Sequence, residues 1–281
     1  MKTIKDKSFG GERPLFESHN LRLESVTITE GESGLKECSN IECDNCRFEG
    51  KYPLWHVDYS RITRCYFAPG SRSAIWYSDD MEMSDTVIDA PKLFREMKNL
   101  TLRNVTINDA DETFWRIDGL HITGLTLIDG TYPFMFSRNI EIDGLVSDSK
   151  YVFQYVKDVV IRNAKITTKD AFWETENVTV YDSEIDGEYL GWHSKNLRLV
   201  NCHIKGTQPL CYCNDLVLEN CTFGDDADLA FEYSTVEADI VGRIHSVKNP
   251  SSGIIVADEI GEIILDDNIK APADCLIRER M

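Results

Sequence analysis

The fold is decided by one stretch of sequence, Asn99-Leu-Thr-Leu-Arg-Asn-Val-Thr-Ile107, because it recurs along most of the chain. Copies are Gly119-Leu-His-Ile-Thr-Gly-Leu-Thr-Leu127, Asn139-Ile-Glu-Ile-Asp-Gly-Leu-Val-Ser147, Asn177-Val-Thr-Val-Tyr-Asp-Ser-Glu-Ile185, Asn196-Leu-Arg-Leu-Val-Asn-Cys-His-Ile204 and Asp215-Leu-Val-Leu-Glu-Asn-Cys-Thr-Phe223. Including the less regular repeats, the corresponding first residues, here called anchors, fall at 20, 40, 59, 80, 99, 119, 139, 158, 177, 196, 215 and 235, always 19 to 21 residues apart. Such a period indicates a solenoid.

The copies have apolar residues one and three places after the anchor, and most have them again six and eight places after it. This spacing predicts two short strands joined by a corner, because alternate side chains of a strand point to opposite faces. Asn, Asp and Gly at the corners suit left-handed backbone angles. With a third strand-like stretch in each repeat, the sequence predicts a single-stranded right-handed parallel β-helix of about 12 rungs. The handedness comes from the general rule for parallel crossovers.

A leucine-rich-repeat horseshoe has a similar period, but its fixed L-x-x-L-x-L frame is missing. A hydrophobic fraction of 42% is enough for a continuous core in one domain of 281 residues. Residues 1–13 are expected to cap the first edge, residues 14–235 to form regular rungs, and residues 236–281 to form irregular final rungs and a C-terminal cap.

The charge of the chain limits its partners. A formal net charge of −18 repels phosphate backbones and anionic lipid heads, so neither nucleic acid nor membrane is expected as a partner. Neither a secretory signal in residues 1–10 nor an apolar run of about 18 residues is apparent, which favours a cytoplasmic location. Nine cysteines, mostly at inward positions, favour reduced buried thiols over disulfides. The oligomeric state is left open.

The stretch before each anchor is where the repeats differ. All five tryptophans lie four places before an anchor, in a column that Lys36, Arg95 and Gln154 interrupt. Ionisable and phenolic residues lie three places before it, and several phenylalanines five places before it. The charged column must face water, so strict alternation puts the tryptophans inside and the phenylalanines outside. A β-bulge would reverse these two columns.

Both arrangements leave an aromatic and charged stripe, which suits a long polyhydroxylated ligand. The alternative is an interior aromatic ladder with a solvated charged edge. The proposed catalytic residues are Asp170, Glu174 and His193, with Glu96 and Arg116 as a second cluster that could be an ordinary ion pair. The proposed substrate-binding residues are Phe172, Trp173, Tyr189, Trp192, Tyr212, Arg95 and Tyr155.

The cysteines do not predict a metal site. Cys202 and Cys221 share the column of Val105 and Leu125, which marks them as core thiols, and no paired C-x-x-C framework is present. Neither a metal nor a cofactor is expected.

The chain also resembles the pectate-lyase-like β-helix superfamily, and within it a family of uncharacterised bacterial proteins. The resemblance covers nearly the whole chain and rests on Gly11-Glu-Arg-Pro-Leu-Phe16, Lys51-Tyr-Pro-Leu-Trp55, Ala74-Ile-Trp-Tyr77, Ala90-Pro-Lys-Leu-Phe-Arg95, Lys169-Asp-Ala-Phe-Trp-Glu174, Gly187-Glu-Tyr-Leu190 and Gly206-Thr-Gln-Pro-Leu-Cys-Tyr-Cys213. It implies the fold. The Asn-Thr-Asp and Asp-Asp pattern of polygalacturonases and the calcium-binding Asp cluster of pectate lyases are missing, so the resemblance implies no catalytic residue.

Two functions are therefore expected. The first is a carbohydrate-active enzyme, a glycan hydrolase whose acid and base lie on the charged stripe, acting on an oligo- or polysaccharide. The alternative is a non-enzymatic solenoid that binds a carbohydrate or a protein with the same stripe. Fold analogy alone favours carbohydrate only in general terms.

Overall fold

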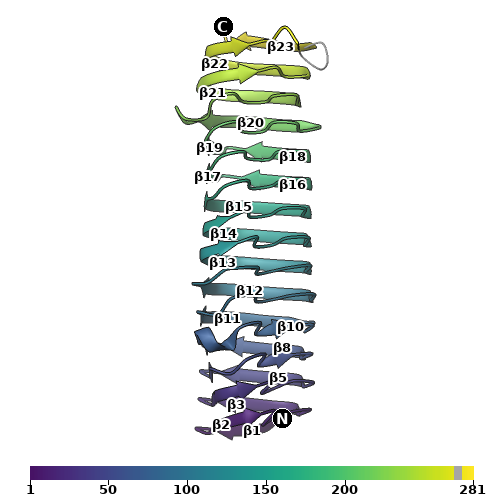
Figure 1. Ribbon diagram of the computed structural model, residues 1–281, viewed down its shortest axis with the longest axis vertical. Helices are drawn as coiled ribbons and strands as arrows, with labels where there is room; N and C mark the ends of the chain where they lie inside the picture. Colours follow the sequence, from purple (N-terminus) through teal and green to yellow (C-terminus); the bar gives the residue numbers. More distant parts are fainter. Residues whose placement is uncertain (269–273) are drawn as a thin grey trace. The chain divides into compact units, whose positions relative to one another are not determined.

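The computed structural model is an all-β parallel β-helix in which short strands of successive rungs pair side by side (Figure 1). It describes residues 1–268 and 274–281. The chain divides into two compact units, Met1–Val146 (unit 1) and Ser147–Met281 (unit 2). Within the described residues, no helix has the length and apolar character needed to cross a membrane.

Unit 1 holds most of the separately numbered strands. They are β1 (Lys2–Lys5), β2 (Ser8–Glu12), β3 (His19–Glu24), β4 (Thr27–Glu32), β5 (Ser39–Asp44), β6 (Arg47–Phe48), β7 (Leu54–Trp55), β8 (Asp58–Thr63), β9 (Tyr66–Phe67), β10 (Ile75–Trp76), β11 (Met81–Ile88), β12 (Lys98–Ile107) and β13 (Asp118–Thr131), with a short 3-10 helix at Pro69–Ser71. Strand β14 (Arg138–Lys150) begins in unit 1 and ends in unit 2.

Unit 2 continues the same pattern. Its strands are β15 (Lys157–Thr167), β16 (Glu176–Tyr181), β17 (Glu184–Asp186), β18 (Lys195–Val200), β19 (His203–Lys205), β20 (Leu216–Phe223), β21 (Thr235–Lys248), β22 (Ser252–Ile264) and β23 (Asp274–Glu279).

The strands pair in the register that the repeat predicts. Leu100 of β12 lies beside Leu120 of β13, and Ile107 lies beside Leu127. The inward residues of β12 are buried, and the same alternation of buried and accessible residues occurs in its neighbours. The predicted fold class is confirmed.

Corners between strands use left-handed residues, as predicted. Asn99 and Asn104 have φ values of 56° and 52°, and Gly119 and Gly124 take the same places one rung later, with φ values of 85° and 71°. The Asn side chains also link rungs, since Nδ2 of Asn99 donates to Oδ1 of Asp80 at 2.8 Å. Asn suits these corners because it tolerates the left-handed region and bonds to its neighbour.

The chain makes about 14 turns rather than about 12. Extra rungs appear at both ends of the sequence. In unit 1, β1 pairs in register with β3, with Ile4 beside Leu23, so the rungs start before residue 14. In unit 2, β22 pairs with β21 and β23 with β22, although the apolar period of the sequence is lost there. Backbone pairing therefore extends beyond the side-chain repeat.

The third side of each rung departs from the preferred prediction. Lys92, Phe94 and Glu96 have φ values of 60°, 46° and 53°. Phe94 is fully buried, Arg95 is half-buried, and Glu96 is exposed. The preferred arrangement, with tryptophans inside and phenylalanines outside, is wrong, and the reversed one is observed. Strict alternation holds for extended residues, whereas left-handed residues at every second position turn the chain and change which side chains point inward.

Phenylalanines consequently form a stacked ladder in the core. In unit 1 the ring of Phe114 lies between Phe94 and Phe134, with centroids 5.0 and 4.7 Å apart. In unit 2 Phe153 stacks on Phe172 at 5.2 Å. All these rings have 0% exposure. Phe172 cannot contact a ligand, which corrects its proposed role in substrate binding.

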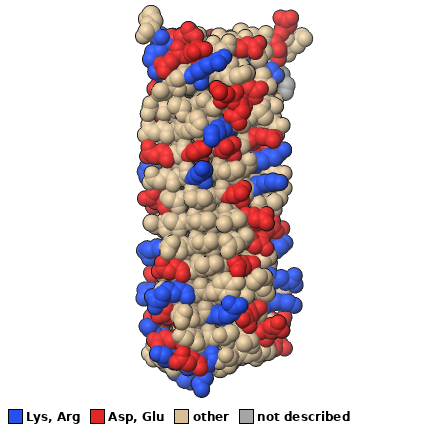
Figure 2. Space-filling model, turned by 90° about the vertical axis from the view of Figure 1, so that its left-hand side faces the viewer, with Lys and Arg blue, Asp and Glu red and all other residues tan. Residues whose placement is uncertain are grey.

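Many surface charges form ion pairs between neighbouring rungs. Figure 2 shows acidic and basic side chains close to one another along the sides and near the ends of the visible face. In unit 1 Nη1 of Arg22 lies 3.0 Å from Oε2 of Glu42, and in unit 2 Nζ of Lys157 lies 3.0 Å from Oε2 of Glu176. Pairing of this kind reduces the repulsion that an excess of 18 negative charges causes.

Candidate functional site

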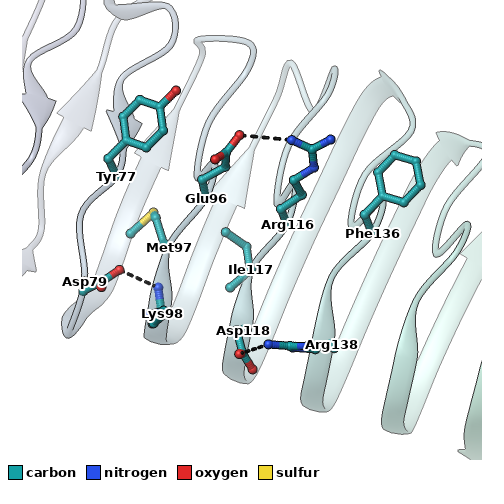
Figure 3. A pocket seen from close by; sticks show the side chains of 10 residues that line it. All are labelled: Tyr77, Asp79, Glu96, Met97, Lys98, Arg116, Ile117, Asp118, Phe136 and Arg138. Atoms are coloured by element: carbon teal, nitrogen blue, oxygen red, sulfur yellow. Dashed lines mark hydrogen bonds and ion pairs between the residues drawn. The ribbon is translucent and has the colours of Figure 1, made fainter.

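A groove of about 490 Å³ runs along four consecutive rungs of unit 1 (Figure 3). One wall, here called the aromatic row, consists of Tyr77, Glu96, Arg116 and Phe136. The other wall, here called the charged row, consists of Asp79, Lys98, Asp118 and Arg138. The buried side chains of Met97 and Ile117 lie between the two rows.

The repeat explains both rows. Residues of the aromatic row lie three places before an anchor and are left-handed, with φ of 56° at Tyr77 and 62° at Phe136. Their side chains point outward, and these two rings are 38% and 44% exposed. Residues of the charged row lie one place before an anchor, where the next strand begins. Each row therefore presents one side chain every ~4.8 Å, the spacing of paired strands.

Glu96 and Arg116, one of the two predicted clusters, lie side by side in the aromatic row. Oε1 of Glu96 is 3.3 Å from Nη1 of Arg116. Both side chains are exposed, so the pair contributes only about 0–1 kcal/mol to stability. The carboxylate is nevertheless engaged by a cation of the protein.

The two other acids of the groove also have protein partners. Asp118 accepts hydrogen bonds from Nη2 of Arg138 at 2.7 Å and from Nδ2 of Asn139 at 2.6 Å. The bond from Arg138 is the main reason why the pKa of Asp118 lies below its ordinary value. Asp79 accepts the backbone N–H of Lys98 at 2.7 Å.

Arg95 has a structural role that the sequence did not indicate. Its guanidinium carbon lies 4.5 Å from the ring centroid of Trp76 and 4.6 Å from that of Trp115, so an indole lies close to it on each side. Its Nη2 pairs with Glu112 at 2.8 Å, and only 18% of the side chain is exposed. Two close indoles leave little of the guanidinium for a ligand, although Arg95 was a proposed substrate-binding residue.

The second predicted cluster lies in unit 2 and is largely aromatic. The ring of His193 is 5.5 Å from Trp173 and stacks on Tyr212 at 4.9 Å. Trp192 contacts Tyr189 and Tyr212, both with centroids 5.2 Å away. Together they form a continuous aromatic surface. Among the other predicted residues, Tyr155 is half-buried, Glu174 is exposed, and Asp170 is half-buried.

Trp173 differs from the other four tryptophans. Those four donate their indole N–H to a backbone carbonyl of the next rung, at 2.6 to 2.9 Å: Trp55 to Ser73, Trp76 to Lys92, Trp115 to Tyr132 and Trp192 to Gln208. Trp173 instead approaches Oε1 of the exposed Glu174 at 3.4 Å. Its ring stacks on Trp192 of the next rung, with centroids 5.6 Å apart, but within the described residues its indole N–H forms no hydrogen bond between rungs.

We expect Trp115→Phe to lower the free energy of unfolding by about 1 kcal/mol more than Trp173→Phe. Both changes remove an indole N–H and similar ring volume, but only Trp115 loses a short bond between rungs. Urea titration followed by circular dichroism measures the difference. Equal losses would contradict the distinct role of Trp173.

Burial raises the pKa of Asp170, and the nearby Glu188 adds to the rise while Lys169 opposes it. A raised pKa favours the protonated form of a carboxyl group, which is the form that a general acid needs.

Several groove residues were missed from the sequence. Tyr77 lies in the column three places before the anchors, and the charged row lies outside the stripe that the sequence predicts. A signal was present: positions 79, 98, 118 and 138 alternate Asp, Lys, Asp and Arg directly before successive anchors. In the part of the chain that the structure describes, no group of three or more His, Cys, Asp or Glu residues could hold a metal ion.

Solved structures similar to the chain have low sequence identity. A mutant of the periplasmic alginate epimerase AlgG is 10% identical, with 98% of this chain and 74% of that one covered and a TM-score of 0.32. PfbA, a surface adhesin of Streptococcus pneumoniae, is 11% identical, with 94% and 72% covered and a TM-score of 0.24. Similarities of this strength carry no argument about function.

No curated protein matches the sequence significantly. The family model described as "Protein of unknown function (DUF3737)" matches residues 2–278. This match agrees with the resemblance noted from the rung sequences. The chain therefore belongs to the DUF3737 family.

Proposed function

We propose that the protein binds an elongated carbohydrate in the groove of unit 1. The observation that carries this proposal is an exposed aromatic ring at each end of the groove, with charged hydrogen-bonding groups between them. Tyr77 and Phe136 are three rungs apart, or about 14 Å at the strand spacing. This distance suits a short oligosaccharide better than a single sugar. Aromatic faces pack on sugar rings, and carboxylates and guanidinium groups bond to hydroxyls.

The groove favours binding over hydrolysis. Glycoside hydrolysis commonly uses one protonated carboxyl group and one free carboxylate on opposite sides of the bond. Glu96 is paired with Arg116, Asp79 accepts a backbone N–H, and the pKa of Asp118 is held low by Arg138. All three carboxylates therefore have partners within the protein, and the lowered pKa of Asp118 disfavours the protonated form that a general acid needs.

Arg116→Ala is the direct test. Oligosaccharides that bind the purified chain on a glycan array are titrated by calorimetry. We expect the variant to raise Kd about 10-fold, because hydrogen bonds from a charged group to the ligand are lost. Arg243→Ala is the matched control, since Arg243 is also an exposed arginine, paired with Glu259 at 3.1 Å but outside the groove. Failure of every oligosaccharide to bind, or equal losses in both variants, would overturn the proposal.

A second candidate function is glycan hydrolysis in unit 2. The observation that favours it is the raised pKa of Asp170, which precedes Trp173 by three residues in the sequence, where Trp173 begins the aromatic surface that continues through Trp192 to Tyr212. In this proposal Asp170 acts as the acid, and Glu174 and His193 assist the attacking water. Release of reducing ends from bound oligosaccharides, abolished in Asp170→Asn, would support it. Binding without any release would eliminate it.

The pKa of Asp170 also predicts a pH-dependent stability. Folding raises the pKa of Asp170, so the ionised carboxylate destabilises the folded chain at pH values above the pKa of the folded chain. Below the pKa of the unfolded chain, about 4, Asp170 is protonated in both states and this destabilisation is absent. We expect Asp170→Asn to raise Tm near pH 7 and to lose this gain near pH 3.

Asp118→Asn is the control with the opposite sign. Because folding lowers the pKa of Asp118, its ionised carboxylate stabilises the folded chain at pH values above the pKa that Asp118 has in the unfolded chain. This stabilisation is lost as the pH falls through the pKa that Asp118 has in the folded chain. We expect the substitution to lower Tm near pH 7 and to have less effect as the pH falls. Melting curves of both variants at a series of pH values check the two signs. If the change in Tm depends on pH in the same way for both variants, the two predicted signs are contradicted.

We further propose a reducing compartment such as the cytoplasm. All nine cysteines are free thiols, and eight of them are buried. Burial raises the pKa of Cys213 to about 11, so this thiol is unreactive near neutral pH. Free buried thiols are typical of cytoplasmic proteins.

A further inference from the structure

The charges of the groove cancel, although the chain as a whole is strongly acidic. Asp79, Glu96 and Asp118 supply three negative charges, and Lys98, Arg116 and Arg138 supply three positive charges, so the sum is zero. The rest of the chain carries the formal net charge of −18. The groove is therefore a locally neutral site on an anionic protein.

All three cations of the groove already interact with carboxylates of the protein. Arg116 pairs with Glu96 at 3.3 Å, and Arg138 pairs with Asp118 at 2.7 Å. The positive charge of Lys98 also acts on Asp118, where it helps to lower the pKa of that carboxyl. A carboxylate on the ligand would compete with these protein carboxylates and would be repelled by the negative field of the chain.

The order of the charges adds a second argument. Along the charged row the sign alternates on four successive rungs, from Asp79 to Lys98 to Asp118 to Arg138, and Glu96 and Arg116 alternate opposite them (Figure 3). Carboxylates only accept hydrogen bonds, and ammonium and guanidinium groups only donate them. A ligand that lies along the charged row must donate hydrogen bonds to the carboxylates and accept hydrogen bonds from the cations on alternate rungs. A hydroxyl does both, whereas a carboxylate or an ammonium group does only one.

We propose that the groove selects neutral oligosaccharides and rejects those with a charged group on each sugar. This inference rests on the proposed function, because it names the class of carbohydrate that the same groove takes. The two exposed rings hold the ends of the ligand, and the alternating charges bond to its hydroxyls. Because no net charge is neutralised on binding, affinity depends little on salt.

The test compares hexasaccharides by calorimetry with the full chain. The neutral set is cellohexaose, xylohexaose, mannohexaose and maltohexaose, and the charged set is the hexamers of galacturonate, mannuronate and glucosamine. We expect at least one neutral hexamer to bind at least about 10-fold more tightly than every charged one. Its Kd should change less than about 2-fold between about 20 and 200 mM NaCl.

Glu96→Gln provides an independent check of the charge balance. The change keeps the shape of the side chain and leaves the groove with one net positive charge. We expect weaker binding of the neutral hexamer, tighter binding of the galacturonate hexamer, and a new dependence on salt. An unchanged preference in this variant would overturn the charge argument.

The outcomes separate the two proposals. Tightest binding of a charged hexamer, weakened by Arg116→Ala, would overturn the inference and leave carbohydrate binding in the groove intact. Binding of no hexamer would overturn the proposed function itself. Preference for a neutral hexamer that Arg116→Ala does not weaken would overturn the assignment to this groove.

Discussion

Phe114→Ala is expected to lower the free energy of unfolding by about 3–5 kcal/mol, the range for removing a buried aromatic ring. The ring of Phe114 is fully buried and stacked between Phe94 and Phe134. Its loss leaves a cavity that the rungs above and below cannot fill, because backbone hydrogen bonds from Phe114 to Leu93 and from Phe134 to Thr113 hold the rungs in place. Urea unfolding followed by circular dichroism and by tryptophan fluorescence measures the loss.

Phe136→Ala is the matched control in the same unit. Phe136 is also left-handed, at 62° against 60° for Phe114, so alanine meets the same backbone demand at both positions. Its ring is 44% exposed, and we expect a loss of no more than about 1 kcal/mol. Comparable losses in the two variants would mean that the phenylalanine ladder is not the core. Two probes are needed because solenoids can unfold in steps.

The strands and two of the corners could be predicted because side chains specify them. Leu100 and Leu102 alternate with polar residues, and Asn99 and Asn104 mark the corners on either side. These residue types have an intrinsic preference for the places they occupy.

The third side could not be predicted in the same way. Its left-handed positions are held by Lys92, Phe94 and Glu96, residue types with no preference for that region. Stacking on the neighbouring rungs imposes this backbone: the backbone N–H of Lys92 donates to Asp111 at 2.8 Å, and that of Glu96 donates to Trp115 at 2.8 Å. Tertiary packing overrides local preference here, so alternation gave the wrong inward column.

Part of the candidate site could be predicted from the sequence because the repeat determines which residues stack on one another. Glu96 and Arg116 were placed together because the repeat stacks residues 20 positions apart, and the structure has them 3.3 Å apart. Lys98 and Asp118 lie two residues further along, past the third side. Their place on the facing wall depends on how the chain turns at Met97 and Ile117, which the sequence pattern does not specify.

The double variant Tyr77→Ala/Phe136→Ala is expected to weaken oligosaccharide binding about 100-fold, and each single variant about 10-fold. The two rings lie at opposite ends of the groove, about 14 Å apart at the strand spacing. Residues this far apart with no shared partner usually contribute additively. Each ring supplies one stacking surface, and exposed aromatic residues of this kind carry much of the energy at binding sites. Calorimetric titration with the tightest neutral hexasaccharide measures the three variants.

Tyr59→Ala is the control for this series. Tyr59 is 65% exposed and left-handed like Tyr77, but it lies in a different depression, beside Asn40 and Arg61. We expect the Tyr59→Ala variant to bind the hexasaccharide with the same Kd as the unchanged chain. If one single variant binds as tightly as the unchanged chain and the double variant loses no more than the other, one ring alone contacts the ligand, and the ligand does not span the groove. If Tyr59→Ala weakens binding as much as Tyr77→Ala does, the ligand lies elsewhere on unit 1 and the groove is not its site.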